Sequence, residues 1–233
     1  MRQIMLDTET TGLDYRRGDR VIEIGCVELV GRKFTQRRFH RYINPMRQID
    51  AGAQAVHGLT NEFLQDKPQF AEIAGEFVDF VRDAELVIHN AAFDLGFLNY
   101  ELDLLGLEPL EQICNGVVDT LRQARELHPG RKNSLDALCD RYAVNNASRT
   151  LHGALLDAEL LAEVYLAMTR GQESLIMDLE VAPLSETMQS ANGERSELVV
   201  LRASDDELAE HDQVLQEINK ESKGKCVWLS DQV

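Results

Sequence analysis

The sequence has few cysteines, no long apolar run and a shortage of positive charge, and each absence excludes a class of protein. The four cysteines, Cys26, Cys114, Cys139 and Cys226, form no Cys-x-x-Cys pair, which argues against a zinc site and a disulfide framework. No stretch approaches the roughly 20 apolar residues of a membrane span. The chain enters a strand at once, without a signal-peptide pattern. We therefore expect a reduced, cytoplasmic protein.

Positive charge is scarce but unevenly distributed. Against 40 Asp and Glu there are 24 Lys and Arg, so the net charge is −16 at pH 7. Such a balance is unusual for a nucleic-acid-binding protein, whose surface is normally basic. From Gly171 onward, however, there are 14 acids and only 5 Lys and Arg, which accounts for more than half of the net charge. Residues 122–149 are locally basic, and we expect a polyanionic substrate to approach through them.

The patterns of the first 170 residues predict an α/β domain. Strands are expected at the N-terminus, at 20–30 and at 33–43, which together form an antiparallel meander ended by Asn44-Pro45. Short strands follow at 85–89 and 117–118, and a loop is expected at 55–60. The expected helices are 61–65, 70–81, 91–105, 120–127, 135–142 and 153–168. This order predicts a mixed sheet flanked by helices.

The last quarter of the chain has a different composition. Residues 171–196 are polar with little periodicity, which predicts a flexible linker after a domain that spans 1–170. The segment 197–233 contains an apolar run at 198–201, an acidic helical pattern at 205–219 and the only tryptophan, Trp228. It is too short to bury a core of its own.

The first apolar run ends in two acids, Asp7 and Glu9. Because alternate residues of a strand share a face, both carboxylates are expected on the same side of the strand end. Like charges that close resist joint ionisation unless a cation separates them. Carboxylate oxygens without a thiol or imidazole cluster favour Mg²⁺ or Mn²⁺. Taken alone, the pair also fits an exposed strand end before a turn.

Three further residues could complete such a site. Asp94 is predicted in the first turn of a helix that follows a buried strand, and Asp157 lies on the helix that begins near Gly153. His152 precedes that helix, where its imidazole could reach a site built by the acids. Alternatively, Asp94 favours only the helix dipole and His152 is a capping or surface residue. Together, four acids and one base suit phosphodiester hydrolysis assisted by two metal ions.

The stretches Asp7–Gly12, His89–Asp94 and His152–Asp157 resemble the three motifs of the 3′→5′ exonucleases that use four acids and a histidine. The resemblance extends through about Thr169, includes the run 132–139, and is strongest for members that proofread for bacterial replicative DNA polymerases. It implies a ribonuclease H-like fold. It also implies excision of mismatched nucleotides from DNA 3′ ends, with release of nucleoside 5′-monophosphates.

The resemblance also implies a role for each matching residue. The residues implied to bind two Mg²⁺ or Mn²⁺ ions are Asp7, Glu9, Asp94 and Asp157. His152 is implied to be the general base that deprotonates the attacking water. The residues implied to contact the substrate are Asp7, Glu9, Thr10, His57 and Asp157.

Partner sites are expected in the tail. Residues 172–176, with Gln172, Leu175 and Ile176, resemble the short peptides that dock on the bacterial sliding clamp, although the same residues also fit an ordinary polar linker. In the family the far C-terminal segment binds the polymerase subunit, for which Trp228 and the run 198–201 are candidates. The alternative is a small helix folded back on the domain.

Two other functions compete with DNA proofreading. A freestanding RNA-trimming exonuclease would carry the same motifs, but it would need neither a clamp-like peptide nor a polymerase tether. A non-catalytic subunit that stabilises a polymerase would be expected to lack at least one catalytic residue, and all five are present.

Overall fold

The structure, a computed structural model, describes residues 1–147, 149, 151–170, 203–222, 224, 226 and 228. These residues belong to two compact units, divided between Val181 and Ala182, and each unit is described by itself. The expected linker 171–196, which includes the clamp-like residues Gln172, Leu175 and Ile176, lies outside the described residues. The apolar run 198–201 also lies outside them.

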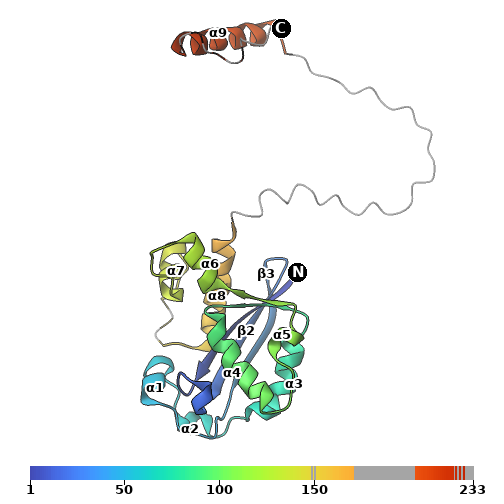
Figure 1. Ribbon diagram of the computed structural model, residues 1–233, viewed down its shortest axis with the longest axis vertical. Coiled ribbons are helices and arrows are strands. Elements are labelled where there is room, and N and C mark those ends of the chain that lie inside the picture. Colours follow the sequence, from blue (N-terminus) through green and yellow to red (C-terminus); the bar gives the residue numbers. More distant parts are fainter. Residues whose placement is uncertain are drawn as a thin grey trace, which may run out of the picture. The chain divides into compact units, whose positions relative to one another are not determined.

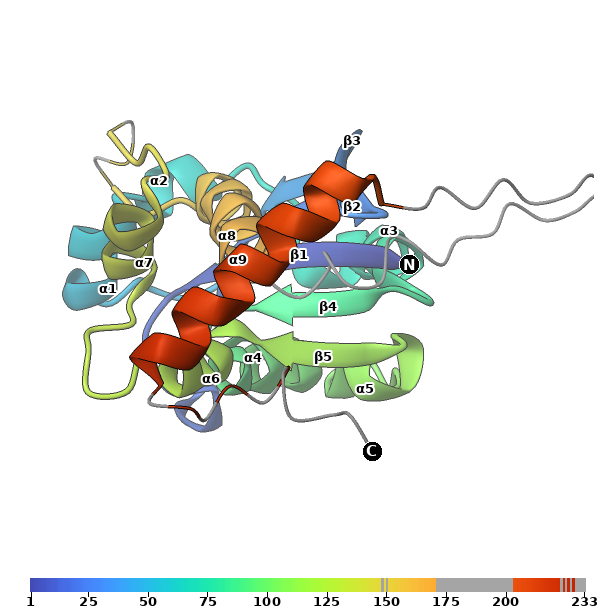
Figure 2. The ribbon, with the colours of Figure 1, turned by 90° about the horizontal axis from the view of Figure 1, so that it is seen from above.

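The first unit is built on a five-stranded mixed sheet with the spatial order β3-β2-β1-β4-β5 (Figure 2). The strands are β1 (Arg2–Thr10), β2 (Val21–Val30), β3 (Lys33–Tyr42), β4 (Glu85–Ile88) and β5 (Gly116–Asp119). The first three are antiparallel, whereas β4 and β5 run parallel to β1. The mixed sheet predicted from the sequence is confirmed, and β1 lies at its centre.

Helices cover both faces of this sheet (Figure 1). The helices of the first unit are α1 (Ala51–His57), α2 (Asn61–Leu64), α3 (Phe70–Val81), α4 (Ala91–Asp103), α5 (Leu110–Ile113), α6 (Thr120–Leu127), α7 (Leu135–Tyr142) and α8 (Ala154–Met168). On β1, Ile4 and Leu6 belong to the core that includes α3 and α4, whereas Met5 packs with α8. This alternation follows from the two-residue period of a strand.

Two short helices were not expected from the sequence. Helix α1 includes His57, where the pattern indicated a loop at 55–60, and α5 occupies a stretch with no expected element. Helix α1 has 7 residues and α5 has 4, and neither has a side-chain hydrogen bond at its N-cap. Helices this short are marginal by themselves and depend on tertiary packing, which local patterns do not report. Thr60 and Ser134 cap α2 and α7, since the side chain of each accepts a backbone hydrogen bond.

The second unit contributes one described helix, α9 (Asp205–Glu221). Ser204 and Glu207 form a capping box at its start, and three acids in its first turn favour the helix dipole. No residue of α9 is buried, and Trp228 beyond it is 82% exposed. All four cysteines are free, as expected. Within the described ranges, no helix combines the length and the hydropathy that a membrane span requires.

Candidate active site

The site is centred on the carboxyl end of β1. Asp7 and Glu9 alternate with the core residues Ile4, Leu6 and Thr8, so they share the α8 side of the sheet with Met5. This is the shared face that the sequence predicted. Since β1 is the central strand, both carboxylates are surrounded by other elements, and Glu9 is only 8% exposed.

Gly25 determines how closely α8 approaches these acids. It lies directly opposite Asp7 in the β1–β2 register. A Cβ atom at Gly25 would lie 2.2 Å from the Ala154 carbonyl carbon and from the Leu155 backbone nitrogen, so any side chain there would displace the start of α8. The glycine thereby lets Asp157, in the first turn of α8, approach Asp7. We did not single out Gly25 from the sequence, although a glycine inside a strand pattern often marks a close backbone approach.

The third acid, Asp94, comes from the opposite helical layer. It lies in the first turn of α4, whose N-cap residue Asn90 adopts the left-handed conformation with φ 69°. Its side chain is 3% exposed, and Thr8 Oγ1 donates a 2.7 Å hydrogen bond to its Oδ1 atom. Thr8, on the other face of β1 from Asp7, therefore holds Asp94 at the strand end. The sequence pattern gave this threonine no role.

The acids raise one another's pKa. Burial, followed by the charges of Asp94, Asp157 and Glu9, raises the pKa of Asp7 well above its ordinary value. Burial and the charge of Asp157 raise the pKa of Glu9 to about 8. Burial raises the pKa of Asp94 to about 7 despite the opposing hydrogen bond from Thr8. A cluster of carboxylates that resists ionisation is one that a cation would stabilise.

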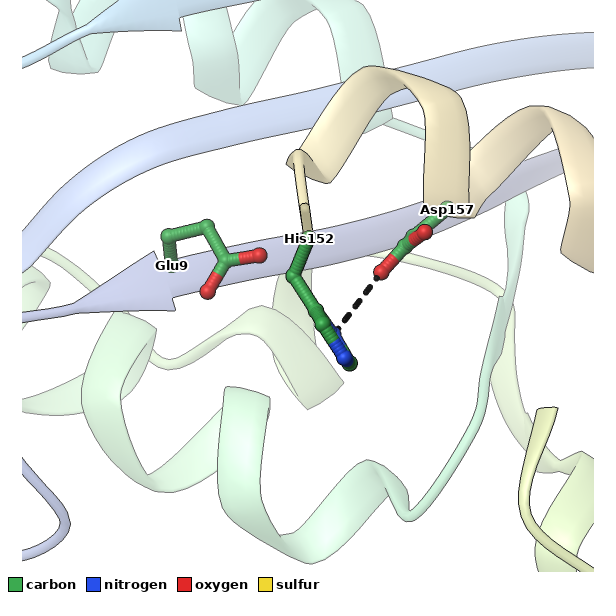
Figure 3. Close-up of side chains that lie close together, drawn as sticks. All are labelled: Glu9, His152 and Asp157. Carbon is green, nitrogen blue, oxygen red and sulfur yellow. Dashed lines mark ion pairs between the residues drawn. The ribbon is translucent and has the colours of Figure 1, made fainter. Parts of the chain in front are cut away.

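His152 lies beside this cluster, on the segment before α8. Its ring is next to Glu9 and Asp157, and one ligand atom from each of the three residues lies within 4.8 Å of the others (Figure 3). The Nδ1 atom is 3.3 Å from Asp157 Oδ2. Its side chain is 46% exposed, so the imidazole borders solvent while the carboxylate beneath it is buried.

Arg149 supplies positive charge to the site. Its guanidinium binds both oxygens of Asp157 and one oxygen of Asp136. The hydrogen bond with Asp157 raises the pKa of Arg149 above its ordinary value, so the side chain is always charged. From the sequence we noted Arg149 only as part of a basic segment, because nothing in the pattern specified which acid it would meet.

Two adjoining cavities open at the site. The larger, about 880 Å³, is lined by all four acids and His152, and on its far wall by Arg125 and Arg131 from the basic segment. The smaller, about 520 Å³, is lined by Glu9, Thr10, His57 and Phe93. The carboxylates therefore lie between a basic wall and a pocket with an aromatic ring, the surroundings that a nucleotide chain requires.

His57 and Thr10 shape the smaller cavity. His57 is 5% exposed and accepts a hydrogen bond at Nδ1 from the Leu59 backbone, which leaves the proton on Nε2. That Nε2 atom is buried with no hydrogen-bond partner among the described residues. The pKa of His57 is lowered, chiefly by burial, with Glu23 and the Thr10 backbone opposing. The Thr10 hydroxyl donates a 2.6 Å hydrogen bond to the Gly12 carbonyl oxygen.

The fold thus brings together the residues predicted for the catalytic centre and the two predicted beside it. Asp7, Glu9, Asp94, Asp157 and His152 share one cavity, and Thr10 and His57 line the next. Trp228 belongs to the second unit, and the clamp-like residues lie outside the described part of the chain. The predicted partner contacts therefore stay predictions.

The sequence matches known proteins along nearly its whole length. The family model described as "Exonuclease" matches residues 4–165. The protein named DNA polymerase III subunit epsilon from Pasteurella multocida is 50% identical over 236 residues, covering 97% of this chain and 93% of that protein. The protein of the same name from Escherichia coli is also 50% identical over 236 residues, covering 97% of each chain.

Solved structures resemble the first unit in backbone. Exonuclease X in complex with 5′-overhanging duplex DNA has a TM-score of 0.58 at 26% identity, covering 73% of this chain and 92% of that one. The nuclease domain of 3′hExo, a DEDDh family member bound to rAMP, has a TM-score of 0.63 at 16% identity, with the same two coverages of 73% and 92%. The second likeness is one of fold alone.

Proposed function

This chain belongs to the exonuclease family and, within it, groups with the DNA polymerase III epsilon subunits, and from this premise we propose how its site works. It is a 3′→5′ exonuclease. In the proposed function it excises mismatched nucleotides from DNA 3′ ends within a replicative polymerase and releases nucleoside 5′-monophosphates. The observation that carries the proposal is the convergence of four carboxylates and one histidine in a single cavity.

The donor set fits divalent metal ions. Three acids with raised pKa values, together with the buried Asp157, offer oxygen ligands in a confined space, as hard cations prefer. We propose that Asp7, Glu9, Asp94 and Asp157 hold two Mg²⁺ or Mn²⁺ ions. When bound, such ions supply an activated water and charge stabilisation for the leaving oxygen. Acids with raised pKa values carry protons when no metal is bound, so binding of the ions releases those protons.

We assign the general-base role to His152. When Nδ1 donates its proton to Asp157 Oδ2, which lies 3.3 Å away, Nε2 is the nitrogen left to accept a proton from the attacking water. Its position at the solvent border lets the proton leave after each cycle.

The smaller cavity is the proposed site of the terminal nucleoside. The unpartnered Nε2–H group of His57 provides a donor for a sugar or base oxygen, and Phe93 provides a ring against which a base can stack. Thr10 holds the turn at Gly12 that borders the cavity. A mismatched end unpairs more easily than a matched one, so it enters a single-strand site more often.

The partners proposed for the chain are the polymerase subunit and the sliding clamp. The relatives' names describe subunits of DNA polymerase III, which supports a polymerase partner here. We propose the organisation expected from the sequence: the exonuclease domain at 1–170, a linker with the clamp-binding peptide at 172–176, and a polymerase-binding segment at 197–233. The exposed Trp228 side chain supports its role as an anchor, because tryptophan is enriched at binding hot spots.

The proposed substrate is tested with two end-labelled strands of one sequence, one DNA and one RNA, each incubated with Mg²⁺. Stepwise loss of 3′ nucleotides from DNA is expected, and it should disappear in Asp7→Ala. The matched control is Asp79→Ala, which removes a 79%-exposed carboxylate on α3 and should leave activity unchanged. A clear preference for RNA would assign the chain to the trimming class, and inactivity on both would favour a structural subunit.

The proposed tail function is tested by ending the chain after Thr169. The truncated protein should retain exonuclease activity, because every site residue precedes that position. It should no longer co-purify with the polymerase subunit. Trp228→Ala in the full chain is the finer test, and retained co-purification after truncation would place the contact on the exonuclease domain.

A further inference from the structure

Arg149 binds one of the four acids of the site directly. The Arg149 guanidinium is 7% exposed and binds Asp157 with two prongs: Nε lies 2.5 Å from Oδ1 and Nη2 lies 2.7 Å from Oδ2. Both carboxylate oxygens that would serve as metal ligands therefore accept hydrogen bonds from the same side chain. Two-pronged pairs of this kind are among the strongest charge-assisted hydrogen bonds in proteins.

The same guanidinium also engages His152. Arg149 Nη2 lies 2.8 Å from His152 Nδ1. A guanidinium only donates, so Nδ1 must accept with its lone pair, and the ring proton is then on Nε2. A proton on Nδ1, facing Asp157 Oδ2 at 3.3 Å, is incompatible with this contact. The shorter distance favours the Arg149 contact, in which Nε2 has no free lone pair for a proton from water.

Arg149 has a third partner, at the cavity wall. Its third contact, at 2.5 Å, is with Asp136, whose side chain is 55% exposed on the wall of the same cavity. Arg149 therefore has a partner that does not belong to the proposed metal-ligand set.

We propose that Arg149 is a built-in counterion of the metal-free site, which competes with divalent ions for Asp157 and withholds His152 from acting as a base until those ions displace it. The inference rests on the proposed function. A guanidinium and a metal ion bound to the same two oxygens repel each other, so each weakens the binding of the other. Asp136 gives the displaced guanidinium a place to stay bound at the cavity wall. Binding of the metal ions would then by itself make His152 available as a base.

The test compares metal affinity and stability in Arg149→Gln with those of the unaltered chain. Mn²⁺ binding, read from the electron paramagnetic resonance signal of the free ion, should tighten about tenfold or more, because the competing charge-assisted hydrogen bonds are gone. Without metal, the melting temperature should fall by at least about 2–4 °C, since a buried carboxylate loses its only close cation among the described residues. Saturating Mn²⁺ should abolish that difference.

Two further variants separate competition from a general field effect. Arg131→Gln removes a positive charge from the same cavity wall, but Arg131 has no ion pair with a described carboxylate. It should change Mn²⁺ affinity little. Arg149→Lys keeps the charge and loses the two-pronged contact, so its Mn²⁺ affinity should lie between that of Arg149→Gln and that of Arg131→Gln. This variant also gives a reading if Arg149→Gln fails to fold without metal.

Several results would overturn the inference. Unchanged or weaker Mn²⁺ binding in Arg149→Gln would show that Arg149 supports the metal site or binds substrate phosphate instead. Equal tightening in Arg149→Gln and Arg131→Gln would reduce the effect to net charge. If the unaltered chain binds no Mn²⁺ at all, the proposed metal function fails, which is a separate outcome from the failure of competition.

Discussion

Buried acids occur in two kinds of surroundings in this protein, and the contrast separates those that stabilise the fold from those that act. Glu28 and Glu101 are 3% and 1% exposed, yet each is bound by arginine. Glu28 accepts hydrogen bonds from Arg2 at 2.6 Å and Arg37 at 3.0 Å, and Arg20 binds both oxygens of Glu101. These carboxylates are compensated by residues that the fold itself supplies.

Asp7 and Glu9, at the end of β1, accept no hydrogen bond from an arginine among the described residues, and the nearby charge of Arg149 lowers their pKa values by less than burial and the other acids raise them. Burial alone would raise the pKa of Glu28, but the hydrogen bonds from Arg2 and Thr35 outweigh it and the pKa is lowered. For Glu9, burial and the charge of Asp157 act together, and the pKa rises to about 8. Glu28 accepts hydrogen bonds from Arg2 and Thr35, and these partners contribute to the difference. The fold leaves the Glu9 cluster to be neutralised by a ligand.

Replacing one acid of each kind is the most direct test of this contrast between the two kinds of buried acid. Asp7→Asn should lower the exonuclease rate by more than roughly 10³-fold, because it removes a charge that we propose binds metal. Its metal-free melting temperature should stay the same or rise, because like-charge repulsion is relieved. Glu28→Gln should do the reverse: it leaves Arg2 and Arg37 partly unpaired and lowers stability, yet retains activity.

Rate assays and thermal melts in EDTA on the two variants check this crossed pattern. A large loss of stability in Asp7→Asn, with activity intact, would mean that the site acids are structural after all. Loss of activity in folded Glu28→Gln would show that the two kinds of acid are not separable.

A substitution at His152 separates the role of the proposed base from the role of the acids. His152→Ala should lower the rate by roughly 10² to 10⁴-fold, the usual contribution of a general base. Mn²⁺ binding should persist, because the four carboxylates remain. Single-turnover rates and Mn²⁺ titration provide the measurements. If Mn²⁺ binding is lost, His152 is a metal ligand, a role its position within 4.8 Å of Glu9 and Asp157 would permit.

The close approach of α8 to the sheet offers a structural way to disturb the site. Gly25→Ala should push the start of α8 away from β2 and move Asp157 and His152 off their positions. A misplacement of about 1 Å can cost about 10²-fold in rate. The matched control is Gly75→Ala at an exposed position of α3, where a Cβ meets nothing within 4 Å and helix propensity improves. Equal rates in both variants would mean that α8 tolerates the shift.

These residues also show what the sequence could and could not predict. Asp7, Glu9, Asp94 and Asp157 were predictable because each lies at an element end that the hydrophobic pattern locates well. Their two-residue or first-turn spacing fixes the side-chain direction without tertiary information. The mixed sheet followed from the order of strands and helices for the same reason.

The supporting residues were not predictable, because their roles depend on contacts between distant parts of the chain. Thr8 meets Asp94 across 86 positions, and Gly25 matters only because α8 packs on β2. Arg149 was one of several basic residues, and no local pattern indicates that it pairs with Asp157. Helix α1 was read as a loop because its seven residues are too few to establish a period.

The smallest expected effect is on the pH dependence of stability without metal. The pKa of Glu9 is about 8 in the folded protein against an ordinary 4.5, and that of Asp94 is about 7 against 3.8. The folded state therefore binds protons more tightly, so this contribution to stability is complete below the ordinary pKa values and is lost as pH rises through 7 and 8. The lowered pKa values of His57 and His89 act in the opposite direction, but only below about pH 6.5.

Melting temperatures in EDTA should consequently fall between about pH 7 and pH 8.5, a window in which the histidines no longer contribute. Glu9→Gln should flatten that decline, whereas Glu28→Gln should not, because the pKa of Glu28 is lowered and its titration ends far below this window. Mg²⁺ should reverse the slope, since it binds the deprotonated acids and its stabilisation grows with pH. A flat profile in EDTA would contradict the raised pKa of Glu9, and with it the contrast between the two kinds of buried acid.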